Sequence, residues 1–384
     1  MITFTTETTD LKKALSVVRL GAGEAAESIH SHALFVLKKG KVILYATDED
    51  KIALSNFSAE YTEEKDIRFT ANPKRMQELI TSSDSDHIKF TYDEEEKTLN
   101  VYASEDSKSF LSFASFEPDE FLTFNKELSD RKVIKILNSE VFLDSMRFSQ
   151  GYLPGDDKDK KYTNIFINEG AMYGSNGNTK IGVFKSSDLE GIETIALRKG
   201  MLSSIIAMID KTGISNVVIK ASDKFITFSS EDNAHCFGFR KPNVDMPDLP
   251  ISIKKPETTG FNIDRKILLK KLKRLSLASW ESIGIKMNFE KDNLLIETIT
   301  DRVSQERMPC KHISGEEKID FILECNPFKN VLDLFKADEI DMFVDQKKCT
   351  IYSEADILVE EEGKESLNKS FVAVGFITLA RVTN

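Results

Sequence analysis

The sequence is poor in the residues that usually mark a secreted, metal-binding or membrane-spanning protein. Among its 384 residues there are four cysteines, five histidines and one tryptophan. The cysteines lie far apart and form no CxxC pair, which favours reduced thiols in an intracellular protein. No apolar run approaches the roughly 18 residues of a membrane helix. The N-terminus lacks a basic segment followed by an apolar one, so we expect no secretory signal.

Motifs for catalysis and metal binding are also missing. The sequence contains no P-loop, GxGxxG, HExxH or GxSxG pattern. The histidines are dispersed, whereas a zinc site needs three or four converging ligands. The acidic runs at 93–97 and 361–366 fit hairpin turns and solvated loops better than a two-metal site. We therefore expect no catalytic activity, no metal and no cofactor.

The chain is acidic as a whole but contains one strongly basic segment. The formal net charge is −11, which argues against indiscriminate binding to nucleic acid. It does not exclude a binder whose positive charge is confined to one surface. The segment 264–275, DRKILLKKLKRL, has six basic residues and one acidic residue.

Three segments of the chain share one plan, with a period of about 127 residues. Each reads as a short amphipathic helix, a turn and two alternating strands that end in serine and an acid. The helix starts align at Pro73, Gly200 and Pro327, at spacings of 127 residues. A second helix followed by a hairpin precedes each of these segments, with helices expected at 10–20, 138–148 and 264–275. Such equal spacing predicts an internal repeat.

The repeat predicts the fold class and the domain boundaries. We expect an α+β protein of three domains of one design, at residues 1–126, 127–254 and 255–384. Each domain would carry two helices on antiparallel sheet. Linker-like composition near 125–131 and 250–258 supports these boundaries.

Positive charge is concentrated on the predicted helices. The six segments 10–20, 71–82, 138–148, 197–211, 264–275 and 326–337 together carry a net charge of +10. In the most basic one, Leu268, Leu272 and Leu275 form an apolar face, while lysines repeat at the same spacing on another face. A solvated surface helix, a membrane-surface helix or a targeting patch would each explain one segment alone. A helix set repeated three times instead favours one shared wall that attracts phosphates without reading bases.

This pattern resembles the bacterial-type DNA polymerase sliding clamp, the beta subunit of the replicase, over the whole chain. LRKGMLSSIIAM, RKPNVDMPDLP and YGSNGNTKIGVF are similar to family segments of the second domain, and LYATDEDKIAL and FTANPKRMQELI to segments of the first. The resemblance implies a divergent member whose two chains close head to tail into a ring around duplex DNA. The helices would line the hole, and continuous sheets would form the outside.

The resemblance also implies a pocket for short peptides between the second and third domains. This sequence departs from the family pattern in two places, at Asn178-Thr179-Lys180 and in the ending FITLARVTN. The implied pocket would be an apolar surface edged by polar groups. The residues at its matching positions are Thr163, Ser175, Gly177, Lys180, Ile181, Pro247, Ile251, Ile377 and Leu379.

Two further sets of residues follow from the resemblance. The implied DNA-binding residues are Lys12, Arg19, Arg147, Lys160, Lys161, Tyr162, Arg198, Lys199, Lys266, Lys270, Lys273 and Arg274. The implied dimer-contact residues are Lys74, Phe110, Leu111 and Phe113 in the first domain and Leu277, Ala278 and Trp280 in the third. An exposed edge strand needs pairing or protection, which ring closure would provide.

The expected function is that of a processivity factor that works by topology. The ring would encircle double-stranded DNA without sequence preference and tether the replicative DNA polymerase, the clamp loader and other proteins with clamp-binding motifs. We expect a cytoplasmic, nucleoid-associated homodimer without a membrane partner, and the sequence leaves cellular or viral origin open. The alternative is a non-ring replication accessory scaffold that binds DNA and protein partners.

Overall fold

The elements of the chain repeat one order three times. The structure, a computed structural model, describes residues 1–25, 28–103, 109–121, 130–155, 160–177, 179–249, 253–277, 283–300, 303–345, 347–359 and 367–379. Within these residues, each repeat runs strand, helix, four strands, helix, three strands, and the third repeat adds the short strand β21 (Lys311–Ser314). The predicted α+β class with antiparallel sheets is confirmed.

The chain folds into two compact units, and each combines parts of neighbouring repeats. The first contains Met1–Ser139 and Gly200–Pro242, and the second contains Glu140–Lys199 and Asn243–Asn384. The predicted boundaries of three domains stay a prediction. Among the described residues, no helix is long and apolar enough to span a membrane.

The first unit contains two antiparallel sheets. The smaller has the order β1 (Ile2–Glu7), β6 (His87–Asp93), β7 (Thr98–Tyr102), β8 (Leu111–Ala114). The larger has the order β5 (Ile67–Ala71), β2 (Ala33–Lys38), β3 (Lys41–Thr47), β4 (Lys51–Ser58), β16 (His235–Arg240), β15 (Phe225–Ser229), β14 (Asn216–Ala221), β9 (Lys132–Asn138). The strand β8 is therefore an edge of the smaller sheet.

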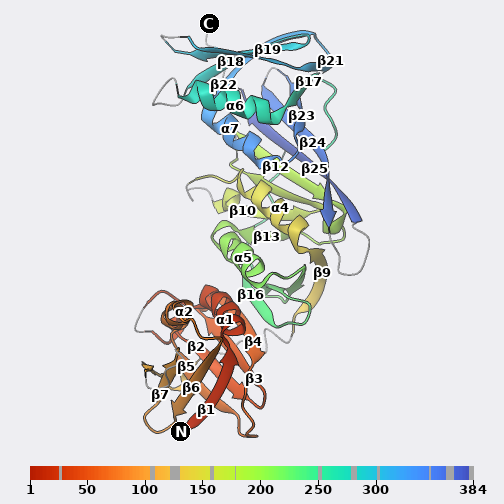
Figure 1. Ribbon diagram of the computed structural model, residues 1–384. Coiled ribbons are helices and arrows are strands. Elements are labelled where there is room, and N and C mark those ends of the chain that lie inside the picture. Colours follow the sequence, from red (N-terminus) through yellow and green to blue (C-terminus); the bar gives the residue numbers. More distant parts are fainter. Residues whose placement is uncertain are drawn as a thin grey trace. The chain divides into compact units, whose positions relative to one another are not determined.

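Helices of the first unit bury their apolar residues against these sheets. The helices are α1 (Thr8–Gly21), α2 (Pro73–Thr81) and α5 (Lys199–Thr212), with short 3-10 turns at η1 (Ile29–Ser31) and η2 (Pro118–Glu120). Helices α1 and α2 lie side by side (Figure 1). Leu11, Leu15 and Val18 recur at helical spacing on α1 and are buried, which explains why this segment packs as a helix.

The second unit also contains two antiparallel sheets. The larger has the order β13 (Ile195–Arg198), β10 (Asn164–Asn168), β11 (Ala171–Ser175), β12 (Lys180–Ser186), β25 (Leu367–Thr378), β24 (Lys348–Val359), β23 (Glu339–Val344), β17 (Thr259–Asp264), β21. The smaller has the order β20 (Gln305–Pro309), β19 (Asn293–Ile299), β18 (Gly284–Glu290), β22 (Lys318–Glu324). The strand β20 is an edge of this smaller sheet.

Helices of the second unit are α4 (Ser139–Gln150), α6 (Arg265–Ser276) and α7 (Cys325–Leu334), with 3-10 turns at η3 (Lys160–Thr163) and η4 (Ser187–Leu189). Helices α6 and α7 are neighbours in Figure 1. Each of the six predicted helices is found near its predicted position, but α7, predicted at 326–337, begins at Cys325 and ends at Leu334. Phe335 is already extended there, and its ring packs edge-on against Phe148, with the centroids 5.2 Å apart.

Two strand pairs join neighbouring repeats into continuous sheets. Strand β4 pairs with β16 in the first unit, and β12 pairs with β25 in the second, both antiparallel. In the second join, Gly182 lies opposite Gly375, and the buried ring of Tyr152 rests on both. A Cβ atom on Gly182 would lie 2.2 Å from that ring, so a larger residue would force it away.

Candidate functional site

The basic segment singled out in the sequence forms helix α6, and its leucines pack as predicted. Asp264 caps the helix, because its carboxylate accepts a hydrogen bond from the backbone N–H of Ile267 at 2.8 Å. The apolar face is buried in the core of the second unit and consists of Leu268, Leu269, Leu272 and Leu275. The basic residues of α6 are thereby left on its remaining surface.

Several basic residues of α6 have acidic partners. The Nζ atom of Lys266 lies 2.8 Å from Asp338. Lys271 and Arg274 both bind Glu306 of β20, at 2.8 and 3.4 Å. Lys270 and Lys273 are exposed. The positive charge of this helix is therefore shared between structural ion pairs and a surface open to a polyanion.

The other residues expected to bind DNA are spread over both units. In the first unit Lys12 is half-buried, and Arg19 is exposed and donates a hydrogen bond to Gln77 of α2 at 3.1 Å. In the second unit Arg147 and Arg198 are exposed. That these residues contact DNA stays a prediction.

Lys199 holds the loop that precedes η3. Its ammonium group donates hydrogen bonds to the carbonyls of Pro154 and Gly155, at 2.6 and 3.1 Å. Lys160 and Lys161 open η3, and their side chains lie outside the described part of the chain. The ammonium of Lys199 thus holds the backbone at Pro154 and Gly155, which is a role that sequence reasoning did not foresee.

Ser175, Gly177 and Lys180, which are expected at the peptide pocket, lie close together where β11 ends and β12 begins. The Ser175 hydroxyl donates to the carbonyl of Lys180 at 3.2 Å and accepts from the N–H of Gly177 at 3.0 Å. Gly177 has φ +94°, and a Cβ there would lie 2.9 Å from the Tyr162 ring. Only glycine fits this position without strain. Thr163 ends η3, directly after Tyr162.

Lys180, at the end of this turn, is half-buried, and burial affects the pKa of its ammonium group. The pKa of the Lys180 ammonium is lowered by burial, an effect that the negative charge of Glu324 opposes. A half-buried cation beside apolar side chains can bind a carboxylate or a backbone carbonyl of a peptide. Lys180 pairs in register with Ile377 of β25.

The apolar residues expected at the pocket lie on two faces of the sheet. Ile377 is buried in the main core of the second unit, and Leu379 packs on the same core. Ile181 instead packs in the cluster of Val374 and Phe376 on the other face. Sequence reasoning missed Val374 and Phe376, because only the strand register reveals which residues share a face.

The segment after β16 lies on the same outer face as Ile181. Val244, Met246 and Leu249 pack on a cluster that contains Val183, which is two positions beyond Ile181 on β12. Pro247 is half-buried within this segment, whereas Ile251 lies outside the described residues. An apolar surface bounded by a loop, with Lys180 at its border, matches the kind of site that binds hydrophobic peptide anchors.

Residues expected at the dimer contact lie on exposed edges. Phe110 and Leu111, at the start of β8, are 50% and 53% exposed. Phe113 is half-buried on the core, and Lys74 of α2 is exposed. Leu277, which follows α6, is 85% exposed. Ala278 and Trp280 fall in a stretch that the structure does not describe.

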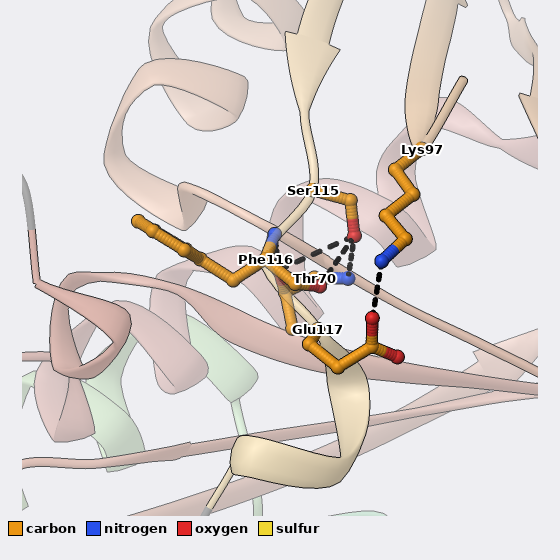
Figure 2. A network of polar contacts seen from close by, with 5 residues as sticks. All are labelled: Thr70, Lys97, Ser115, Phe116 and Glu117. Carbon is orange, nitrogen blue, oxygen red and sulfur yellow. Dashed lines mark hydrogen bonds and ion pairs between the residues drawn. The ribbon is translucent and has the colours of Figure 1, made fainter. Parts of the chain in front are cut away.

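Edge strand β8 is anchored at its end by a polar network (Figure 2). The N–H of Thr70 donates to the Ser115 hydroxyl at 2.8 Å, and the N–H of Phe116 donates to the Thr70 hydroxyl at 2.7 Å. Lys97 and Glu117 form an ion pair beside it. Because Thr70 belongs to β5 of the larger sheet, the network fixes β8 relative to both sheets of the first unit.

Metal binding has no basis in the part of the chain that the structure describes. Within those residues, no group of three or more His, Cys, Asp or Glu side chains could hold an ion. Cys236, Cys325 and Cys349 are buried, and burial raises the pKa of each thiol. Cys310 is partly exposed, and burial of its sulfur raises its pKa to about 11.

Comparison with known proteins gives matches in structure only. No protein-family model matches the sequence, and no curated protein matches it. Solved structures similar to the whole chain include the Helicobacter pylori beta clamp bound to a DNA ligase peptide, with a TM-score of 0.77 and 17% identity over 99% of this chain and 100% of that one. The Helicobacter pylori beta clamp in complex with carprofen gives a TM-score of 0.81, also at 17% identity over 99% and 100%. The DNA polymerase III beta subunit of Thermotoga maritima gives 0.78 at 14% identity over 100% of both chains. The chain therefore has the fold of the bacterial sliding clamps from end to end, as its internal repeat indicates.

Proposed function

We propose that this chain is a DNA sliding clamp, a processivity factor that closes as a head-to-tail homodimer around duplex DNA. The observation that carries the proposal is the pair of internal joins, β4 with β16 and β12 with β25. Each join pairs the third of the four strands between a repeat's two helices with the last strand of the next repeat. One strand of each kind is left at an edge, β20 and β8, so a second copy can supply the missing partner.

The two internal joins share one register, which predicts the register of the third. In the first, a row of paired residues runs Thr70, Leu34, Tyr45, Leu54, Cys236, Ser229, Val218, Ile136. In the second, the row runs Ala196, Phe166, Tyr173, Val183, Val374, Tyr352, Asp341, Asn262. Each row begins and ends three residues before the first residue of a helix. Thr70 and Ile136 have this position before α2 and α4, and Ala196 and Asn262 have it before α5 and α6.

Each of the two four-stranded sheets contains half of such a row. In the smaller sheet of the second unit, the row runs Ile322, Lys286, Glu297, Gln305 and ends on β20. In the smaller sheet of the first unit, it starts with Thr5 and Lys89 and continues towards β8. Extending the β7–β8 register by one residue adds Phe110 opposite Tyr102, and their rings lie 5.4 Å apart. A third join of the same kind puts Gln305 opposite Phe110 and Ser304 opposite Leu111.

Exposure of apolar residues supports this join. On one face of the sheet, Phe110 of one edge would lie beside Val303 at the other edge and near Ile299 of β19, which are 61% and 49% exposed, and on the opposite face Leu111 would lie beside Ser304. Pairing would cover these side chains and satisfy the free backbone groups of both strands. Full burial of one such side chain stabilises by about 1.5–3 kcal/mol.

Disulfide trapping tests the register. Leu111→Cys with Ser304→Cys, in a Cys310→Ser background, should give a covalent dimer under mild oxidation, since opposed residues have close Cβ atoms. The matched control is Leu111→Cys with Gln305→Cys, which points to the other face and should cross-link poorly. A strictly monomeric wild-type protein, instead of one near twice 43.4 kDa, would favour the non-ring scaffold.

The function in the cell would follow from topology. Exposed basic residues such as Lys270 and Lys273 would contact phosphates without reading sequence, and the apolar surface at Ile181 would bind peptides of the replicative polymerase, the clamp loader and other partners. The chain itself would catalyse no reaction and would work in the cytoplasm at the nucleoid. After loading, it should stay on circular DNA and slide off linear DNA, and equal loss from both would refute the mechanism.

A further inference from the structure

The two internal joins and the free edge of β20 have different residues at one equivalent position, on the sheet face that the helices cover. In the first join, the Ser55 hydroxyl and the Nδ1 atom of His235 lie 2.7 Å apart. In the second, Phe184 lies opposite Ala373 and stacks on Phe371, with ring centroids 4.7 Å apart. Glu306 follows Gln305 on β20 and has the position equivalent to Ser55 and Phe184.

Glu306 is tied to the helix that covers its sheet. Its side chain is 18% exposed, and its carboxylate accepts a hydrogen bond from Lys271 at 2.8 Å. The other oxygen lies 3.4 Å from Arg274. The hydrogen bond from Lys271 and the charge of Arg274 lower the pKa of the Glu306 carboxyl. The carboxylate is thus held charged and in one orientation.

Strand β20 is held on one side by its pairing with β19, which includes a hydrogen bond from Gln305 to Glu297 at 2.6 Å, but it buries little of its own surface. Of its five residues, only Met308 is buried. Glu306 lies two residues before Met308, so its side chain points to the same face of the strand. The ion pairs of Glu306 therefore connect the half of β20 that precedes Met308 to helix α6, in addition to its pairing with β19, and this is the half that the third join would use.

We propose that Glu306 is a positioning residue for the join between two copies of the chain. Its ion pairs with Lys271 and Arg274 hold edge strand β20 in the position that accepts β8 of a second copy. This inference rests on the proposed ring. A strand already held in its paired position loses less freedom on association, so the join is tighter than with a loose edge.

The same arrangement assigns different roles to neighbouring basic residues of α6. Lys271 and Arg274 serve the join, whereas Lys270 and Lys273 remain available to phosphates. The predicted register also puts Ser109 opposite Glu306. A carboxylate has about four acceptor positions, so the Ser109 hydroxyl of the second copy can donate to it without displacing Lys271.

The test compares Glu306→Gln with a matched control. Glu290→Gln removes the same charge from the same sheet, where Glu290 lies 3.7 Å from Lys318 and both side chains are about three-quarters exposed. The dimer dissociation constant is measured by sedimentation over a concentration series. We expect Glu306→Gln to raise it about a hundredfold, because each of the two joins of the ring would weaken about tenfold, and Glu290→Gln to leave it unchanged.

A second measurement separates positioning from general destabilisation. In dilute, monomeric samples, amide hydrogen exchange at 305–308 should be faster in Glu306→Gln than in the wild type, while protection of β18 and β22 stays the same. If Glu306→Gln does not fold, Lys271→Gln should show the same pattern with a smaller change.

The outcomes distinguish this inference from the proposed ring. A wild-type protein that is monomeric at all concentrations refutes the ring. A wild-type dimer that Glu306→Gln leaves equally tight overturns the positioning role and leaves the ring standing. Equal weakening by Glu306→Gln and Glu290→Gln also overturns it, since net charge alone would then explain the effect.

Discussion

Truncation of Leu111 gives the most direct energetic test of ring closure. Leu111 is 53% exposed on edge strand β8, so about half of its side chain remains to be buried by a partner. Complete burial of a leucine stabilises by about 1.5–3 kcal/mol, so burial of the exposed half contributes about 1 kcal/mol. A ring of two chains contains two such joins. Leu111→Ala should therefore weaken the dimer by about 2 kcal/mol, or about thirtyfold in dissociation constant.

The assay is sedimentation or mass photometry over a dilution series, with thermal unfolding of each variant as a check of the fold. Val133→Ala is the matched control, because Val133 is also a strand residue, is 58% exposed and lies on β9, outside the proposed join. A wild-type dimer that Leu111→Ala leaves unchanged would refute the assignment of β8 to the join. Equal weakening by Val133→Ala would show that loss of exposed apolar surface is not specific to this edge.

Three further predictions concern the turn, the helix and acid pH. Gly177→Ala should lower the free energy of unfolding by about 1–3 kcal/mol, whereas Gly155→Ala, with open space around it, should have little effect in the same denaturant titration. Replacing both Lys270 and Lys273 by Gln should reduce the slope of log affinity against log salt for duplex DNA by about 2 if each contacts one phosphate, and an unchanged slope would remove them from the DNA surface. The folded pKa of Glu306 is lowered, so its contribution to stability is present above the ordinary value of 4.5 and is lost as pH falls through the folded pKa. The difference in unfolding free energy between wild type and Glu306→Gln should shrink on acidification, and a difference that grows would contradict this sign.

Much of the fold could be predicted from sequence because the repeat states it three times. The predicted helix starts at Pro73, Gly200 and Pro327 lie within two residues of the observed starts and identify equivalent segments, and the leucine spacing on 264–275 identifies the buried face of α6. These are local patterns of propensity and periodicity. In a repeat, a helix or strand predicted in one copy can be compared with the equivalent segments of the other two copies, which a single domain does not allow.

The remaining features depend on long-range pairing, which local patterns do not encode. The ion pairs of Glu306 with Lys271 and Arg274 join residues more than thirty positions apart, so the sequence showed only a basic helix. The separation of Ile181 and Ile377 onto two faces depends on strand register, where a shift of one residue exchanges the faces.

Equal pairing in the three joins would not make them equally durable. The strands of the β4–β16 and β12–β25 joins belong to one chain, so after a fluctuation each edge meets its partner at a high effective concentration. In the proposed ring, the edges of β8 and β20 would be kept near each other only by the other intermolecular join, and once both joins open they would meet only at the concentration of free protein. Dilution, a competing strand or a loading protein would therefore act on the intermolecular joins of such a ring first. In such a ring the covalent connectivity of the chain, rather than a specialised weak contact, determines where the gate opens.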